Sequence, residues 1–132
     1  MKHFYLVGGG TGITPLYQIV QYVTEAESPQ QRPSVTILFA NKTEDDILLQ
    51  PELKALAEQN PTFKCFFSVD KATRDNWDGF TGFVNEEKIG KTIPEDVENT
   101  FFAVCGPPPL CNIVDKMLST KFNVKPSRFY RF

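Results

Sequence analysis

The sequence has few histidine and cysteine residues. Its single histidine, His3, lies near the amino terminus, and its three cysteines (Cys65, Cys105 and Cys111) are odd in number and lack CxxC spacing. This pattern is typical of reduced thiols rather than of a disulfide framework or a zinc site, so we expect no metal site and a cytoplasmic location. A GxSxG motif is also missing, which disfavours a hydrolase.

Long apolar runs and an excess of one charge are missing as well. No stretch of about 18 apolar residues occurs, and no basic segment followed by an apolar one stands at the start, so we expect no direct membrane insertion by this chain. The 14 basic and 16 acidic residues give a formal net charge of -2, which favours neither nucleic acid nor an anionic membrane as a partner. A length of 132 residues predicts one domain with a single core.

Strand-like apolar segments alternate with helix-like segments along the chain. We expect strands at residues 3–7, 34–40, 63–69, 100–106 and 127–132, and helices at residues 15–27, 51–60, 86–90 and 108–121. A surface turn is expected at residues 28–33. Thr14 followed by Pro15 is typical of an N-cap and a first helical position, and Asn85 of a cap for the short helix. The alternation predicts an α/β fold, a three-layer Rossmann-like parallel sheet of about five strands.

The stretch GGGTGITP, residues 8–15, joins the first expected strand to the first expected helix. Glycine lets backbone N–H groups approach a ligand closely, and the unpaired N–H groups at a helix start attract anions. This order places Gly10, Thr11 and Gly12 where a pyrophosphate would sit. A P-loop is excluded because no lysine follows, and the GxGxxG fingerprint fails because Pro15 and Asn41 replace its last glycine and its acidic residue. A tight turn without a ligand explains the spacing equally well.

A second segment, CGPPP at residues 105–109, follows the fourth expected strand. Ligands of parallel α/β sheets bind beyond the carboxyl ends of the strands, so both segments are expected at the binding edge. The stretches GGTGITP, FANKTEDDILLQPEL, GFVNEE and CGPPPL stand in this order and together span nearly the whole chain. In them the sequence resembles the NADH-binding lobe of the ferredoxin reductase-like flavoenzymes, and in particular the NADH–cytochrome b5 reductases and the flavin part of eukaryotic nitrate reductases.

The resemblance implies a set of nucleotide-binding residues, in which the glycine turn holds the pyrophosphate. These residues are Gly9, Gly10, Thr11, Gly12, Thr14, Pro15, Phe39, Ala40, Asp70 and Phe83. Asp70 would favour NADH over NADPH, because a carboxylate accepts a ribose hydroxyl but repels a phosphate. Lys71 beside it would offset part of that charge. Without the resemblance, a residue such as Asp70 is more often a turn residue, and Phe39 and Phe83 are equally explained as core residues.

The resemblance also implies residues near the reacting end of the coenzyme. Cys105 would lie beside the nicotinamide and orient the ring without covalent chemistry. Gly106, Pro107 and Pro108 would fix the backbone next to it, and Phe132 would approach the flavin. Taken alone, a free cysteine such as Cys105 is more commonly a small buried residue at a strand end.

The activity that the resemblance implies is hydride transfer from NADH to FAD, followed by electron transfer in single steps to a haem protein such as cytochrome b5. The Arg-x-Tyr-Ser/Thr motif of the family's FAD-binding lobe is missing, since the nearest string, RFYR, has Arg131 in place of the hydroxyl residue. We therefore expect residues 1–132 to be the NAD(H)-binding domain, with the FAD-binding domain upstream of this chain. A membrane anchor of the parent enzyme would lie upstream as well.

Two other interpretations remain open. The chain is also explained as the C-terminal NADH domain of a nitrate reductase or another multidomain fusion, or as a nucleotide-binding module without enzymatic activity. Alone, the chain is expected to bind NADH weakly, without FAD and without turnover.

Overall fold

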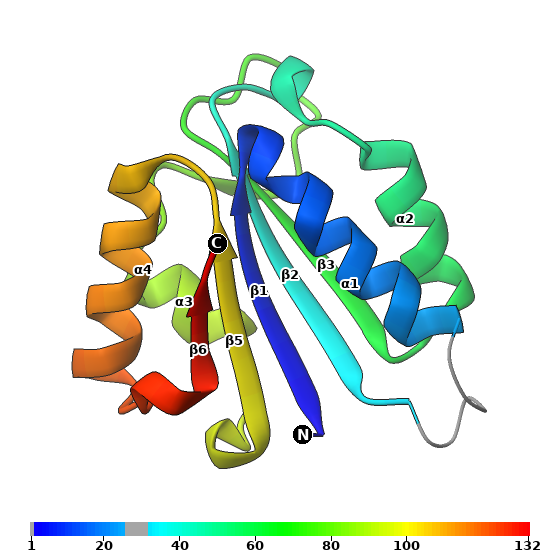
Figure 1. The fold of residues 1–132 in the computed structure, drawn as a ribbon. Helices are drawn as coiled ribbons and strands as arrows, with labels where there is room; N and C mark the ends of the chain where they lie inside the picture. The colour runs from blue at the N-terminus through cyan, green and yellow to red at the C-terminus, as the bar shows by residue number, and fades with distance from the viewer. Residues whose placement is uncertain (1, 26–31) are drawn as a thin grey trace.

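The computed structural model describes residues 2–25 and 32–132, and this part of the chain forms one six-stranded parallel sheet (Figure 1). The strands are β1 (His3–Gly9), β2 (Ser34–Asn41), β3 (Phe63–Val69), β4 (Phe80–Thr81), β5 (Thr100–Cys105) and β6 (Phe129–Arg131). They lie in the order β4-β3-β2-β1-β5-β6, and every neighbouring pair is parallel. Because the order reverses at β1, a crevice is expected at the carboxyl ends of β1, β2 and β5.

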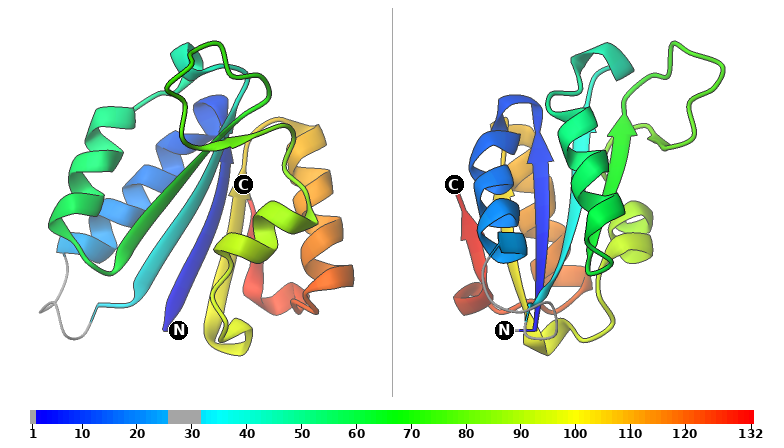
Figure 2. Two further views of the ribbon diagram at one scale, coloured as in Figure 1. Left: turned by 180° about the vertical axis from the view of Figure 1, so that it is seen from behind. Right: turned by 90° about the vertical axis from the view of Figure 1, so that its right-hand side faces the viewer.

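Helices cover both faces of the sheet, which gives the three layers that the sequence predicts (Figure 2). Helices α1 (Ile13–Glu25) and α2 (Gln50–Gln59) pack on one face, and α3 (Glu86–Thr92) and α4 (Pro108–Lys121) on the other. Leu16 of α1 shares a buried cluster with Ile37 of β2, and Val114 of α4 shares another with Phe102 of β5. In the described part of the chain no helix is long and apolar enough to cross a membrane.

The central strands are buried on both faces, which explains their nearly unbroken apolar sequence. Leu6 of β1, Leu38 of β2 and Val104 of β5 are fully buried. Apolar residues on both faces are typical of parallel strands that are covered by helices. The hydroxyl of Tyr5 within this core shares a hydrogen bond of 2.6 Å with Oγ1 of Thr92, so it is not left unpaired.

The sequence predicts most of these elements within two residues of their ends, with a few differences. Strand β4 lies in a segment expected to be a loop, because a strand of two residues shows no periodicity. A 3₁₀ turn at residues 126–128 replaces the start of the last expected strand. Residues 26–31, which hold the end of the first expected helix and most of the turn expected at residues 28–33, lie outside the described residues.

The start of the first helix also differs from the prediction. A 3₁₀ turn, Gly10–Gly12, continues directly into α1 at Ile13, so Thr14 lies within the first turn of the helix and is not an N-cap. The cap expected at Asn85 is confirmed, because its Oδ1 accepts a hydrogen bond of 2.9 Å from the N–H of Lys88.

Candidate functional site

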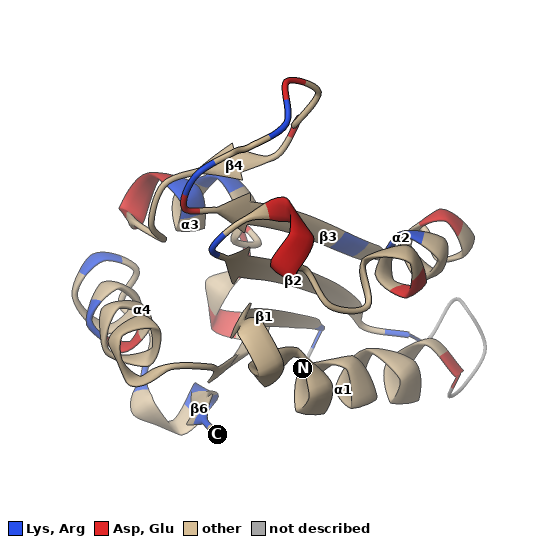
Figure 3. Cartoon of the chain, turned by 90° about the horizontal axis from the view of Figure 1, so that it is seen from above, with Lys and Arg blue, Asp and Glu red and all other residues tan. Residues whose placement is uncertain are grey.

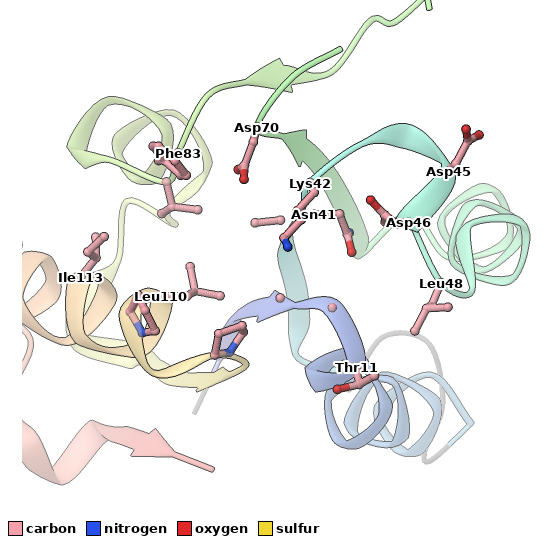
Figure 4. Close-up of a pocket in the computed structure, with 16 residues that line it drawn as sticks. Thr11, Asn41, Lys42, Asp45, Asp46, Leu48, Asp70, Phe83, Leu110 and Ile113 are labelled. Atoms are coloured by element: carbon pink, nitrogen blue, oxygen red, sulfur yellow. The ribbon is translucent and has the colours of Figure 1, made fainter. Parts of the chain in front are cut away.

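A pocket of about 660 Å³ opens at the carboxyl edge of the sheet (Figure 4). It is lined by the β1–α1 turn, the segment after β2, the segments on either side of β4 and the start of α4. Its lining residues are Gly9, Gly10, Thr11, Ala40, Asn41, Lys42, Asp45, Asp46, Leu48, Asp70, Phe83, Val84, Pro107, Pro109, Leu110 and Ile113. A pocket of this size accommodates a small organic ligand.

The β1–α1 turn touches the connection between β5 and α4, backbone against backbone. A Cβ atom at Gly12 would lie 2.2 Å from the carbonyl oxygen of Cys105, so this approach requires glycine. Gly10 has a φ of 55°, and a Cβ atom there would meet nothing within 4 Å. The turn therefore presents open space in front of its backbone. The two glycine-containing segments of the sequence form one structural unit.

The amino end of α1 is suited to an anion. The helix has 13 residues and no acidic residue in its first turn. The N–H of Ile13 donates to the carbonyl of Gly10, so the N–H groups that begin this helical segment are those of the 3₁₀ turn Gly10–Gly12. Together with the helix dipole, N–H groups at such a start attract negative charge. Thr11 is exposed at the pocket and adds a hydroxyl donor. This arrangement fits a diphosphate group.

Three aspartates lie on the side of the pocket away from the β1–α1 turn (Figure 4). Asp45 pairs with Arg74, and Asp46 accepts hydrogen bonds from the N–H and the hydroxyl of Thr43 at 3.1 and 2.9 Å. The acidic 3₁₀ turn that carries both stands out at this edge of the molecule (Figure 3). Within the described residues the exposed carboxylate of Asp70 makes no hydrogen bond or ion pair, so it is available to a ligand hydroxyl.

Two further nitrogen groups come from the end of β2 and the residue that follows it. Nδ2 of Asn41 is buried and has no hydrogen-bond partner among the described residues, although Asn41 lines the pocket. Buried amide groups without a partner are uncommon in folded proteins. The ammonium group of Lys42 makes no ion pair within the described part of the chain. Both groups are therefore available to a polar ligand.

The opposite wall is apolar and comes from α4 and the segment after β4. Leu110 and Ile113 of α4 line the pocket together with Val84 and Phe83. Phe83 is 75% exposed, which rules out the alternative that its side chain belongs to the core. Apolar walls and exposed aromatic rings of this kind suit the flat face of a base or a nicotinamide ring.

Comparison with known proteins shows the family of this chain. The family profile of the oxidoreductase NAD-binding domain matches residues 6–116. This chain belongs to the oxidoreductase NAD-binding domain family. The matched region of this NAD-binding domain contains every residue that lines the pocket.

The NAD-binding domain is similar to part of several longer reductases. It is 44% identical over 111 residues to NADH-cytochrome b5 reductase 3 from Rattus norvegicus, covering 83% of this chain and 36% of that protein. It is 40% identical over 116 residues to NADH-cytochrome b5 reductase 1 from Candida glabrata, covering 87% of this chain and 40% of that protein. The chain thus spans less than half of the length of either reductase.

A solved structure shows the same fold with a related sequence. The cytochrome b5 reductase domain of Ulva prolifera nitrate reductase matches this NAD-binding domain with a TM-score of 0.90 and 31% sequence identity. The match covers 100% of this chain and 49% of that one. The chain is therefore similar in sequence to part of the NADH-cytochrome b5 reductases, as the resemblance predicts, and it has the fold of part of this nitrate reductase domain.

The structure brings part of the predicted site of this NAD-binding domain together in the pocket. The predicted residues that line it are Gly9, Gly10, Thr11, Ala40, Asp70, Phe83 and Pro107. Other predicted residues are not part of the lining: Gly12 is buried, Pro15 and Gly106 are half-buried, and Thr14 and Pro108 are exposed. Phe39 is placed differently, because its side chain is fully buried and contacts the core on the α1 and α2 face. The core alternative for Phe39 is the correct one.

Cys105 and Phe132 lie at the carboxyl edge of the sheet but outside the pocket lining. Cys105 ends β5 and is half-buried. Burial raises the pKa of its thiol, and the neighbouring Cys111 raises it further, so the thiol is neutral near pH 7. This protonation state agrees with a role in positioning rather than in nucleophilic attack. Phe132 is 50% exposed, and its N–H donates a hydrogen bond of 3.0 Å to the carbonyl of Val104.

Several pocket residues were not predicted from the sequence. Asn41 was noted only as a departure from the dinucleotide fingerprint, and Lys42 follows it directly. Leu110 and Ile113 follow the CGPPP segment at helical spacing, which by itself is typical of a face packed on the sheet. A signal was nevertheless present, because the carboxyl ends of neighbouring parallel strands meet at one edge and the residues after each of them are candidates for the site.

Proposed function

We propose that this chain binds NADH in the pocket and presents its nicotinamide for hydride transfer to FAD. The electrons then pass in single steps to a haem protein such as cytochrome b5. The observation that carries the proposal is the pocket itself, which joins the β1–α1 turn, the Asp70 carboxylate and the segment after Cys105 in one cavity.

The chemistry of each part of the pocket supports one orientation of the coenzyme. The diphosphate would bind at Gly10, Thr11 and the amino end of α1, where N–H groups and the helix dipole favour an anion. The adenosine ribose would lie at Asp70, which accepts hydroxyl hydrogen bonds. The nicotinamide would then extend toward Pro107 and the neighbouring Cys105. In the sheet register, Gly8 pairs with Cys105, so the proposed diphosphate and nicotinamide sites follow adjacent strands.

The FAD-binding domain and the haem protein are proposed partners that lie outside this chain. FAD would be held mainly by the upstream domain, with Phe132 near it. The similar reductases are more than twice as long as the matched region, which leaves room for such a domain. We further propose that the domain works in the cytoplasm, in line with its reduced cysteines.

A second candidate function has its own support. The high TM-score to a nitrate reductase domain favours, as an alternative, the C-terminal NADH domain of a nitrate reductase or another multidomain fusion. The chemistry in this domain would be the same, and only the electron acceptor would differ.

The proposal is tested by titrating NADH into the intact protein, meaning the full polypeptide in which these residues occur, and by following flavin reduction without oxygen. We expect saturable NADH binding and complete reduction of bound flavin. Binding without flavin reduction would favour a nucleotide-binding module without enzymatic activity. Absence of NADH binding would reject the proposal.

A further inference from the structure

Glu44 is a buried acidic residue that joins two of the segments around the pocket. It is 6% exposed, although it begins a short 3₁₀ turn between β2 and α2. Its carboxylate accepts hydrogen bonds from the N–H of Thr73 at 3.0 Å, from the hydroxyl of Thr73 at 3.1 Å and from the N–H of Arg74 at 2.8 Å. Both partners belong to the segment that follows β3 and carries Asp70.

These contacts continue a series of hydrogen bonds that begins at the ends of β2 and β3. The N–H of Asp70 donates to the carbonyl of Asn41 at 2.9 Å, and the N–H of Lys71 donates to the carbonyl of Lys42 at 3.2 Å. The segments after the two strands therefore run side by side beyond the edge of the sheet. Glu44 forms the last buried connection between them.

Few other contacts hold the segment that Glu44 anchors. Residues 71–76 are all exposed. The Asp45–Arg74 ion pair lies between side chains that are 71% and 60% exposed, and ion pairs this exposed contribute little to stability. Desolvation opposes the ionisation of Glu44, but the hydrogen bonds from Thr73 and Arg74 outweigh it and lower the pKa of the carboxyl. The group is thus ionised at neutral pH and accepts all of these bonds.

We propose that Glu44 is a positioning residue for coenzyme selection, which fixes the segment after β3 so that the Asp70 carboxylate stays where it meets the adenosine ribose. This inference rests on the proposed function, in which Asp70 discriminates between NADH and NADPH. Glu44 does not line the pocket, so it acts through Asp70. When the anchor is lost, the segment samples more conformations and Asp70 no longer holds one place, which weakens its contact with the ribose.

The experiment measures the dissociation constants of the intact protein for NADH and NADPH by calorimetry. Glu44→Gln keeps the size of the side chain but removes its charge and one acceptor oxygen. It is expected to weaken NADH binding more than NADPH binding. The dissociation constant for NADPH divided by that for NADH should therefore fall by about three- to tenfold. In an Asp70→Ala background the same substitution is expected to leave the ratio unchanged, because the residue that it positions is gone.

Two further variants make the result specific. Thr73→Val, which removes only the hydroxyl contact, is expected to shift the ratio in the same direction by a smaller factor. Glu58→Gln makes the same chemical change as Glu44→Gln at an exposed position of α2 and is expected to keep the wild-type ratio.

The inference is overturned if Glu44→Gln weakens the binding of NADH and NADPH equally. It is also overturned if Glu44→Gln changes the ratio of the two dissociation constants as much in the Asp70→Ala background as in the wild type. Should Glu44→Gln fail to fold, Thr73→Val decides the question by the same two comparisons. A wild-type protein that binds neither coenzyme rejects the proposed function itself, so the two failures are distinguishable.

Discussion

Among the residues that line the pocket, Asp70 differs from its acidic neighbours in its surroundings. Asp45 is paired with Arg74 and Asp46 with Thr43, whereas the Asp70 carboxylate has no partner within the described residues. A ligand hydroxyl there gains a charge-assisted hydrogen bond, and a phosphate meets a negative charge.

Replacing Asp70 with alanine therefore tests coenzyme preference directly. Asp70→Ala is expected to narrow the gap between the NADH and NADPH affinities by about tenfold, or about 1.4 kcal/mol. The reason is that the substitution removes the carboxylate that repels the additional phosphate of NADPH. The measurement is a titration of each coenzyme into the intact protein. Asp78→Ala, at an exposed position of the same connection but outside the pocket lining, serves as the control. An unchanged preference would remove Asp70 from the site.

Cys105 is the residue whose effect should appear in the reaction rather than in binding. Cys105 is half-buried where β5 ends, its backbone lies beside Gly12 of the β1–α1 turn, and its thiol is neutral. Cys105→Ala is expected to slow flavin reduction by NADH about tenfold in stopped-flow experiments while the NADH dissociation constant changes less, because a misplaced ring lowers the rate steeply. Flavin reduction at the wild-type rate would contradict this role.

Cys65→Ala provides the matched control for that experiment. Burial raises the pKa of Cys65 to about 12, so its thiol is also neutral, and it lies in β3 away from the pocket lining. The same loss of a thiol there is expected to leave the reduction rate unchanged.

At the scale of elements, the contact between the β1–α1 turn and the end of β5 depends on a missing side chain. A Cβ atom at Gly12 would lie 2.2 Å from one backbone atom of Cys105 and 2.5 Å from another. Gly12→Ala is therefore expected to lower the free energy of unfolding by about 3 kcal/mol, measured by chemical denaturation. Gly90→Ala, in the exposed part of α3 where a Cβ meets its nearest atom at 3.9 Å, is expected to change it by less than about 1 kcal/mol. Equal effects of Gly12→Ala and Gly90→Ala on the free energy of unfolding would mean that the fold does not depend on the contact between the β1–α1 turn and the end of β5.

The sequence predicts the elements that have strong local signals and fails where tertiary contacts decide. The buried strands β2 and β3 and the proline-started α4 are recognisable from apolar runs and helix-start residues. The 3₁₀ turn before α1 is not, because Thr14 followed by Pro15 looks like a helix start in either case. Short β4 exists only because its residues pair with the end of β3.

In the candidate site too, residues with strong local signals were predicted and residues placed by tertiary contacts were not. The glycine turn and the CGPPP segment have recognisable backbone chemistry, so their place at the edge of the sheet was predicted correctly. Phe39 was assigned to the nucleotide through resemblance, but its position in the strand pleat turns the side chain toward the core. Glu44 has no such signal in the sequence, because its partners, Thr73 and Arg74, are 29 and 30 residues away.

At the scale of the whole molecule, the last strand brings the carboxyl terminus beside the end of β5 (Figure 1). β6 is the edge strand of the sheet, and the N–H of Phe132 bonds the carbonyl of Val104, next to Cys105. The exposed rings of Tyr130 and Phe132 contact each other edge to face, with centroids 4.8 Å apart. Exposed aromatic residues grouped at a sheet edge are typical of a surface that another domain covers.

If the FAD-binding domain covers this surface, Phe132 should affect the transfer between domains and not the binding of the coenzyme. Phe132→Ala is expected to slow flavin reduction by NADH about threefold, because loss of the ring loosens the alignment of the two domains. The NADH dissociation constant should stay at its wild-type value, since Phe132 does not line the pocket. Tyr22→Ala removes an exposed ring from α1 and should change neither quantity. A Phe132→Ala protein with weaker NADH binding and an unchanged reduction rate would place the coenzyme, rather than the second domain, against this end of the sheet.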